Sequence, residues 1–291
     1  MSKTDYQDWI AERQQLLERI KNLETENAEL KKRLGVEVGY TTETSITTKR
    51  LSLQDKINLF RSLFKGREDV FARRWYSKTT GKSGYQLVCQ NEWNPQLCDK
   101  KKYKCSDCPN RQFARITDND FYRHLEGKDA DSRDVIGLYV LNEDNTCHFL
   151  CTDFDDKNCK YGYQDDVLAF VDVCKSWGVP CSIERSRSGK GAHIWIFFET
   201  PILAINARKL GNAILTEAMN RNGKINFRSY DRFFPNQDTM PEGGLGNLVA
   251  LPLQGMSRRN GNSVFVNDKF ETYPDQWEYL LNVKKLTESS L

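Results

Sequence analysis

The sequence predicts an α+β protein. From Val135 onward, apolar stretches with the two-residue period of strands alternate with stretches that have helical spacing. Hydrophobic residues make up 38% of the 291 residues and aromatic residues 11%, which is enough to bury a substantial core. Residues 66–130 are irregular by comparison and rich in cysteine, lysine and aromatic residues. We therefore expect an α/β core that carries a cysteine-rich insertion.

Charge and hydropathy exclude several classes of protein. Lys and Arg number 43 and Asp and Glu number 40, so the net charge is +3. This excludes a uniformly basic nucleic-acid coat but leaves room for a local basic patch. The longest apolar runs, such as residues 194–198, are too short to span a membrane, and the polar N-terminus does not look like a signal peptide. Nine cysteines, an odd number, fit free thiols and a metal site in a reducing cytoplasm better than a disulfide scaffold.

Residues 1–35 are predicted to form a helical arm. Leu16, Leu23 and Leu30 recur every seven residues, and Asn27 occupies a position that fixes register in parallel dimers. One interpretation is a short coiled coil that makes a homodimer or docks a partner. The alternative is a solvated amphipathic helix that packs on its own domain.

The remaining elements follow a Thr-rich linker over residues 36–50. The turn at residues 142–145 joins the first two predicted strands, and a Gly-rich hairpin joins the next two. In chain order, we expect a helix over 52–65, strands over 135–141 and 147–154, a helix over 165–177, strands over 181–185 and 193–198, a helix over 204–220 and a strand over 247–253.

Four cysteines in the irregular region have the composition of a zinc site. Cys89, Cys98, Cys105 and Cys108 follow the spacing C-x8-C-x6-C-x2-C, and the last pair can hold one tetrahedral ion from a tight turn. The alternative is a set of unligated buried thiols. The other cysteines fall at apolar or turn positions and are expected to pack in the core: Cys147, Cys151, Cys159, Cys174 and Cys181.

Cations and aromatic rings are interleaved in the same region. Six cations stand against Asp99 and Asp107, and they are Lys100, Lys101, Lys102, Lys104, Arg111 and Arg115. The rings are Trp93, Tyr103 and Phe113. Phosphate-seeking cations beside stacking rings suit contact with a single strand or template. A solvated basic loop around a structural zinc is the alternative.

Two carboxylates follow the strand that ends in FLCTDFDD. The two-residue period places Asp153 and Asp155 on one face and Phe154 on the other. Two carboxylates at this spacing can share divalent cations, and oxygen ligands select Mg²⁺ or Mn²⁺. Two-metal phosphoryl transfer needs such a pair. The alternative is an acidic turn at a strand end.

A Gly-rich hairpin follows in IERSRSGKGAHIWIFF. Its glycines let backbone N–H groups approach an anion, and Arg187 and Lys190 add positive charge. The segment is not a P-loop, because a strand rather than a helix follows it. His193 enters that strand directly, so we interpret it as a triphosphate ligand, with a structural histidine as the alternative.

A third segment supplies further acids and cations. Asp231 and Asp238 precede the strand that ends at residues 251–253, and Arg258 and Arg259 follow it. Each acid is a candidate metal ligand or a solvated loop carboxylate.

Together, these segments resemble the archaeo-eukaryotic primase superfamily, the primase-polymerases. The shared pattern is D-x-D at a strand end, then S-G-x-G-x-H, then a third acid before an apolar strand. Longer stretches, including TDFDD, ERSRSGKGAHIWIFF and SYDRFFPNQDTMPEGGLGNL, resemble the primase domain of the TOTE conflict systems and the primase-polymerases associated with CRISPR loci. The likeness extends over residues 50–285.

This resemblance implies both a fold and an activity. The fold would be a primase core, an RRM-like sheet plus a second α/β module, with a zinc-binding insertion and a coiled-coil arm. Residues 51–130 would form its N-terminal part and residues 131–291 the catalytic core. The activity would be template-directed nucleotidyl transfer, which makes or extends primers on single-stranded DNA or a primer-template from nucleoside triphosphates.

The resemblance also implies roles for individual residues. Asp153, Asp155 and a third acid would bind two Mg²⁺ or Mn²⁺ ions, while Ser188 and His193 would contact the phosphates. Asp238 is preferred as the third acid because it stands nine residues before Asn247, as the corresponding acid does in relatives, and Asp231 is the runner-up.

One strand departs from the family pattern. Asn247 and Ala250 stand where relatives can carry arginine. We therefore assign phosphate charge to Arg185, Lys190 and Arg258.

Two other functions stay open at this point. One is another metal-dependent nucleotidyltransferase or a nuclease on the same acids. The other is a catalytically silent nucleic-acid-binding module. Relatives continue into helicase and nuclease domains. One expectation is that those activities, or a CRISPR partner, are on separate chains, and the alternative is that they are absent. The sequence leaves open de novo priming against extension, the sugar preference and the pathway.

Overall fold

The computed structural model describes residues 51–156, 162–223 and 227–287, and four separate positions near the N-terminus, 15, 18, 19 and 22. The chain divides into two compact units, Met1–Arg50 and Leu51–Leu291. In the first unit, the four described positions are helical and exposed. The rest of the predicted arm over 1–35, the linker over 36–50 and Cys159 lie outside the described residues.

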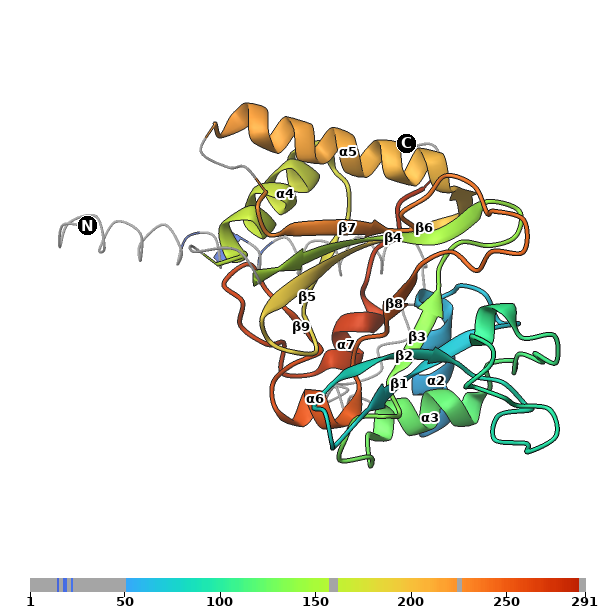
Figure 1. Ribbon diagram of the computed structural model, residues 1–291. Helices are drawn as coiled ribbons and strands as arrows, with labels where there is room; N and C mark the ends of the chain where they lie inside the picture. Colours follow the sequence, from blue (N-terminus) through green and yellow to red (C-terminus); the bar gives the residue numbers. More distant parts are fainter. Residues whose placement is uncertain are drawn as a thin grey trace, which may run out of the picture. The chain divides into compact units, whose positions relative to one another are not determined.

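The second unit is built on two antiparallel sheets (Figure 1). The four-stranded sheet has the order β2-β1-β3-β8, with β1 at Phe71–Tyr76, β2 at Ser83–Leu87, β3 at Ile136–Tyr139 and β8 at Leu248–Ala250. The five-stranded sheet has the order β7-β4-β6-β5-β9, with β4 at Thr146–Asp155, β5 at Ser182–Arg185, β6 at Gly191–Leu203, β7 at Tyr230–Phe234 and β9 at Val264–Val266. The helices are α2 at Leu53–Leu63, α3 at Asp118–Glu126, α4 at Gln164–Trp177, α5 at Ala204–Arg221, α6 at Gly255–Arg259 and α7 at Gln276–Leu281.

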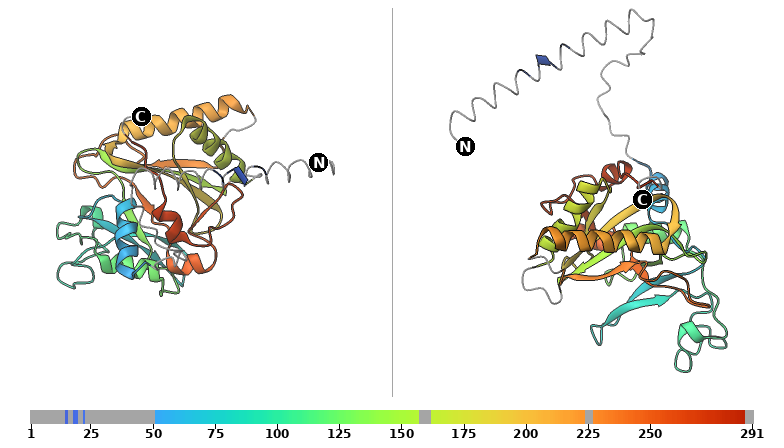
Figure 2. Two further views of the ribbon diagram at one scale, coloured as in Figure 1. Left: turned by 180° about the vertical axis from the view of Figure 1, so that it is seen from behind. Right: turned by 90° about the horizontal axis from the view of Figure 1, so that it is seen from above.

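The two faces of the five-stranded sheet have different neighbours. Helices α4 and α5 cover one face, as the views from the front and from behind both show (Figures 1 and 2). Phe154 on that face packs against Phe170 of α4, with ring centroids 6.0 Å apart. On the opposite face, Trp195 packs edge to face against Phe64, which follows α2, at 5.0 Å. Because side chains alternate along a strand, every second residue of β4 points away from α4 and α5.

Several predicted elements are confirmed closely. The helix expected over 165–177 is α4, and the helix expected over 204–220 is α5. The strands around the Gly-rich hairpin are β5 and β6, which pair antiparallel. These elements could be predicted because each one has the hydrophobic period of its own secondary structure.

One expectation needs correction. Residues 66–130, expected to be irregular, contain β1, β2 and α3.

The strands expected over 135–141 and 147–154 are confirmed as β3 and β4, and they belong to different sheets. The turn between them passes the chain from one sheet to the other, and β8 pairs with β3 instead.

His124 of α3 is buried and neutral in this core. Its Nε2 donates to the carbonyl of Pro252 at 2.8 Å, and its Nδ1 accepts from the backbone N–H of Ile136 at 3.2 Å. Burial, with the positive charge of Arg258, lowers the pKa of His124 to about 4. Protonation would therefore remove the acceptor that Ile136 uses.

We expect this histidine to make stability depend on pH. A pKa lowered in the folded state means that stability is present above the ordinary pKa of about 6.5 and is lost as the pH falls toward 4. The loss is about 2 kcal/mol between about pH 7 and pH 5. Urea unfolding of the wild type and of His124→Gln at both pH values measures it. An equal drop in both proteins would contradict the assignment.

Among the described residues, no helix is both long enough and apolar enough to cross a membrane.

Candidate functional site

Asp153 and Asp155 lie on the face of the five-stranded sheet that α4 and α5 leave free. Asp153 pairs in register with His193 of β6, and Asp155 pairs with Gly191. The strand period predicted for this motif is therefore present, because Phe154 points to the opposite face, into the core. Neither carboxylate is on a loose turn.

A β-bulge brings Asp231 to the same place. On β7, Arg232 pairs with Asp153 and Tyr230 pairs with Phe154, so Asp231 is the extra residue between two consecutive pairs. Bulges of this kind re-aim a side chain and are common beside active sites. Burial, and then the negative charges of Asp231 and Asp155, raise the pKa of Asp153, while His193 opposes the shift. The negative charges of Asp155 and Asp231 thus both act on Asp153.

Asp238 lies elsewhere and has a partner of its own. Its carboxylate forms an ion pair with Arg208 of α5, and its side chain is 44% exposed. Asp231 is also paired, since Arg232 donates to it at 2.8 Å, but that pair remains within the electrostatic reach of Asp153. The structure therefore brings the runner-up acid, rather than the preferred one, to the carboxylate pair.

His193 is held from both sides by carboxylates. Its Nδ1 lies 2.8 Å from Glu184 Oε2, and its Nε2 lies 3.5 Å from Asp153 Oδ1. Burial by itself would lower the pKa of His193, but the charge and hydrogen bond of Glu184, with help from Asp153, raise it to about 9. The imidazole is therefore cationic at neutral pH.

Glu184 belongs to this candidate site, and the sequence reasoning missed it. It is 1% exposed, and Trp195 Nε1 donates to its Oε2 at 2.9 Å. A carboxylate in the short apolar strand before the hairpin was the available signal, because antiparallel pairing sets residue 184 opposite His193.

The Gly-rich hairpin stands directly beside the carboxylates. The backbone N–H of Asp156 donates to the carbonyl of Lys190 at 2.9 Å, and the N–H of Lys190 donates to the Ser188 hydroxyl oxygen at 3.2 Å. Gly189 has φ +74°, and a Cβ there would lie 2.7 Å from Asn262 Oδ1. A Cβ on Gly191 would lie 2.3 Å from the carbonyl oxygen of Phe154. Gly189 is therefore favoured by its positive φ, and Gly191 is required for the close approach of hairpin and strand.

Arg187 connects this hairpin to the four-stranded sheet. Its charge acts on Tyr85 of β2 and on Arg74 of β1. Burial, and then the nearby Arg187, lower the pKa of Arg74. Two guanidinium groups are thus near one another and near the hydroxyl of Tyr85. Arg74 and Tyr85 were not predicted, because they come from the region expected to be irregular.

The other two predicted phosphate ligands bind backbone carbonyls. Arg185 donates to the carbonyl of Gly261 at 2.8 Å and to that of Phe270. Arg258 donates to the carbonyl of Leu125 at 3.3 Å, and burial lowers its pKa. In this structure, both guanidinium groups support the fold around the hairpin and α6.

The cysteine loop, residues 88–115, carries the four predicted zinc ligands. Cys89, Cys98, Cys105 and Cys108 line one pocket, together with Leu97 and Phe113 among others. Among the described side chains of residues 81–115, none is buried, so this region has no core of its own. Burial raises the pKa of the Cys105 thiol, and Cys98 and Cys89 are near enough to add to the shift.

At both candidate metal sites, the types of side chain suit a metal ion, but the side chains are not yet arranged around one point. Over residues 51–156, 162–223 and 227–287, no three His, Cys, Asp or Glu side chains already stand in a metal-binding arrangement. The donors themselves fit, because four thiols in one pocket suit Zn²⁺ and clustered carboxylates suit Mg²⁺ or Mn²⁺.

A family comparison agrees with this geometry. The model of the archaeo-eukaryotic primase domain of the TOTE conflict system matches residues 55–291, which includes both sheets, the hairpin and the cysteine loop. Among curated proteins, none matches the sequence. The match covers most of the chain and the whole carboxylate site. The chain therefore belongs to the archaeo-eukaryotic primase family of the TOTE conflict systems.

Proposed function

We propose that this protein is a primase-polymerase that joins nucleotides on a single-stranded DNA template. The observation that carries the proposal is the convergence of Asp153, Asp155 and Asp231 beside His193 and the Gly-rich hairpin. The family supports a nucleotidyltransferase or primase in general. Carboxylates next to a cationic phosphate site are what transfer from a nucleoside triphosphate requires.

The carboxylates would hold Mg²⁺ or Mn²⁺. Asp153 and Asp155 are the first two ligands, and Asp231 replaces Asp238 in our assignment, because its charge acts on Asp153. When bound, the ions would supply charge stabilisation and lower the pKa of the attacking hydroxyl. The crowding of three acids also supplies a reason for cation binding, since it relieves their mutual repulsion.

The triphosphate would lie along the hairpin. Cationic His193 faces Asp153, and Glu184 fixes the orientation of its ring through Nδ1. Ser188 and Lys190 offer a hydroxyl and an ammonium group from the tight turn, in which the Lys190 N–H donates to Ser188. These groups would hold the phosphates and stabilise charge as the leaving pyrophosphate departs. Arg185 and Arg258 would act on them only indirectly, through the backbone that they support.

We also propose that the cysteine loop binds one Zn²⁺ through Cys89, Cys98, Cys105 and Cys108. None of the described side chains of residues 81–115 is buried, so this region has no hydrophobic core to stabilise it. A bound metal would supply that stabilisation instead. Homodimerisation through residues 1–35 stays a prediction.

Cys105→Ser should lose the zinc and loosen the loop. We expect about one zinc per chain in the wild type and much less in the variant, with the loop becoming sensitive to protease. Elemental analysis and limited proteolysis measure the two effects. Cys174→Ser, a buried cysteine on α4, is the matched control and should keep its zinc. A wild-type protein that is purified without zinc would contradict this ligand set.

The deciding experiment is a primer-free assay on single-stranded DNA with labelled nucleotides and Mn²⁺ or Mg²⁺. Short labelled products establish a primase, and extension of an added primer alone establishes a polymerase that needs another initiator. Degradation of the template without incorporation would indicate a nuclease, which has no use for a triphosphate site. DNA binding with no chemistry in either format would leave a silent binding module.

A further inference from the structure

The cysteine loop exposes aromatic rings to an unusual degree. Trp93 is 74% exposed and Tyr103 is 37% exposed, and the other exposed large aromatic side chain among the described residues is Trp177. Trp93 has φ +64°, a backbone conformation that bulky residues rarely adopt. Its ring gains little from burial at that position. The zinc that we propose for the loop explains its cysteines but leaves these rings unexplained.

Cations lie over the rings of this loop. The Lys100 ammonium lies 4.0 Å from the centroid of the Trp93 ring, and the Arg111 guanidinium lies 5.5 Å from that of Phe113. Lys102 lies 5.1 Å from the Tyr103 ring. The loop has six cations against three carboxylates, and one carboxylate, Glu92, is paired with Lys100. Most of the excess positive charge is therefore directed to solvent.

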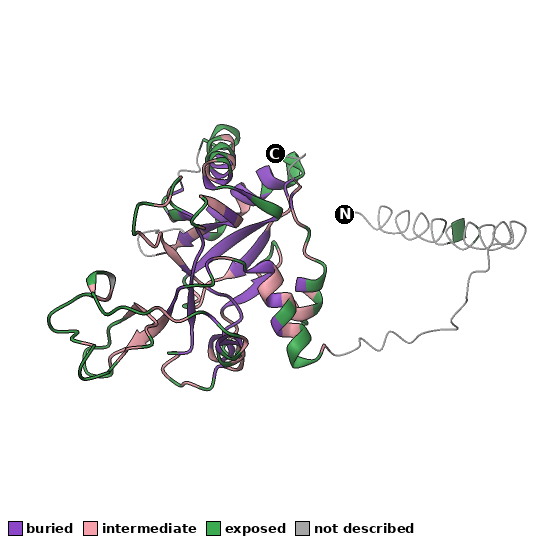
Figure 3. Ribbon diagram, turned by 90° about the vertical axis from the view of Figure 1, so that its right-hand side faces the viewer, coloured by how far each residue is buried: buried purple, intermediate pink, exposed green. Residues whose placement is uncertain are grey.

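The cysteine loop packs against the sheet that the hairpin approaches. The charge of Arg187 on the hairpin acts on Tyr85 of β2. Tyr85 and Leu87 point to one face of the four-stranded sheet, where Phe113 of the cysteine loop packs in the same partly buried cluster. Phe113 and β2 therefore connect the exposed rings and cations of the loop to the strand beside the hairpin. Figure 3 shows this end of the unit as mostly intermediate and exposed.

We propose that the cysteine loop is a binding surface for the single-stranded polynucleotide that leads to the carboxylate site. Trp93 stacks on an unpaired base, and Lys101, Lys102 and Lys104 neutralise phosphates. Bases of any sequence have a π-face, so this surface binds without sequence preference. The inference rests on the proposed function for its direction, but the binding itself requires no catalysis.

The test is fluorescence anisotropy of the zinc-loaded protein with labelled oligothymidylate of about 20 nucleotides, without added Mg²⁺ or Mn²⁺ and without nucleoside triphosphate. Trp93→Ala should raise the Kd about tenfold, and Trp93→Phe should restore most of the affinity. Trp177→Ala, which removes an exposed ring at the end of α4, is the matched control and should bind as the wild type does. Oligouridylate serves as the second probe, and loss of either ligand on Trp93→Ala supports the surface.

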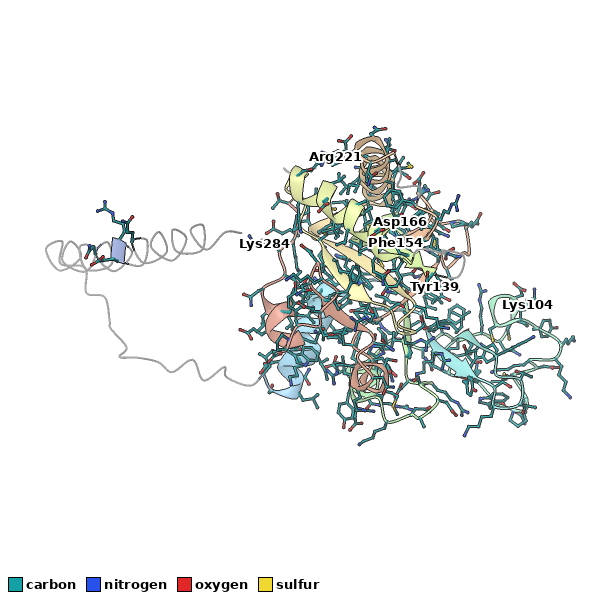
Figure 4. All side chains as sticks on the ribbon, turned by 90° about the vertical axis from the view of Figure 1, so that its left-hand side faces the viewer. Lys104, Tyr139, Phe154, Asp166, Arg221 and Lys284 are labelled. Carbon is teal, nitrogen blue, oxygen red and sulfur yellow. The ribbon has the colours of Figure 1, made fainter. Side chains whose placement is uncertain are left out.

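The lysines are tested through salt dependence. Lys101→Gln with Lys102→Gln should reduce the slope of log affinity against log salt by about 1.4. Lys209→Gln with Lys284→Gln is the control pair, because both lysines are exposed and lie outside the loop. Figure 4 shows Lys284 on the opposite side of the unit from Lys104. An unchanged slope in the Lys101 and Lys102 variant would overturn the role of the lysines.

Two results would overturn the proposal as a whole. One is a Trp93→Ala protein with wild-type zinc, wild-type melting temperature and unchanged affinity. The other is a duplex of equal length that competes as well as the single strand, because paired bases cannot stack on Trp93. Failure of the proposed function alone would give a different result. The protein would then incorporate no nucleotides but would still bind the single strand through Trp93, and the binding surface would stand.

Discussion

Asp153→Asn combined with Asp155→Asn should abolish nucleotide incorporation and leave the fold intact. We expect a loss of about a thousandfold or more, because both proposed ligands of the divalent ions disappear together. Stability should stay equal or rise. The pKa of Asp153 is raised by burial and by its acidic neighbours, so the folded state disfavours its charged form, and a neutral isostere removes that penalty.

The measurement pairs incorporation with thermal unfolding. Asp165→Asn, on the first turn of α4, is a control that changes one carboxylate away from the bulge. Loss of activity together with a strong drop in melting temperature would show that the two acids are structural. Retained activity in a correctly folded double variant would contradict the assignment of Asp153 and Asp155 as metal ligands.

Asp231→Asn and Asp238→Asn should differ sharply. Asp231 is the extra residue of the β7 bulge and acts electrostatically on Asp153, so we expect its replacement to lower activity at least about a hundredfold. Asp238→Asn breaks only the partly exposed pair with Arg208. Pairs of this kind contribute about 1 kcal/mol or less, so activity should stay within about threefold of the wild type.

Both variants are assayed on the same primer-template, with metal titrations beside them. A higher Mn²⁺ requirement in Asp231→Asn, without the same change in Asp238→Asn, supports the assignment. The reverse pattern would return the role to Asp238. Arg208→Ala adds a further control, because it breaks the Asp238 pair and leaves both acids in place.

Local signals predicted the parts of the site that lie within single segments. Asp153 and Asp155 share a face because strands have a period of two, and the hairpin is read from its glycines. His193 follows that hairpin directly in the chain. These inferences needed no knowledge of which strands pair.

Features that depend on pairing could not be predicted in this way. The choice between Asp231 and Asp238 depends on a bulge, which shifts register between β4 and β7 by one residue. Spacing to the next strand favoured the other acid. Glu184 matters because of its cross-strand partner, and Arg74 and Tyr85 matter because the second sheet stands opposite the hairpin. Each of these roles depends on a non-local contact, which the sequence of its own segment does not specify.

Because the chain passes between the two sheets and back, there are few places where it can be divided into fragments that fold independently. The four-stranded sheet takes β3 from just before β4, and it takes β8 from after β7. A cut anywhere between β3 and β8 therefore leaves one fragment without a strand that its sheet needs. Truncation at residue 130 would also separate β1 and β2 from β3. Active halves should be recovered only when both fragments are produced together and fold around each other.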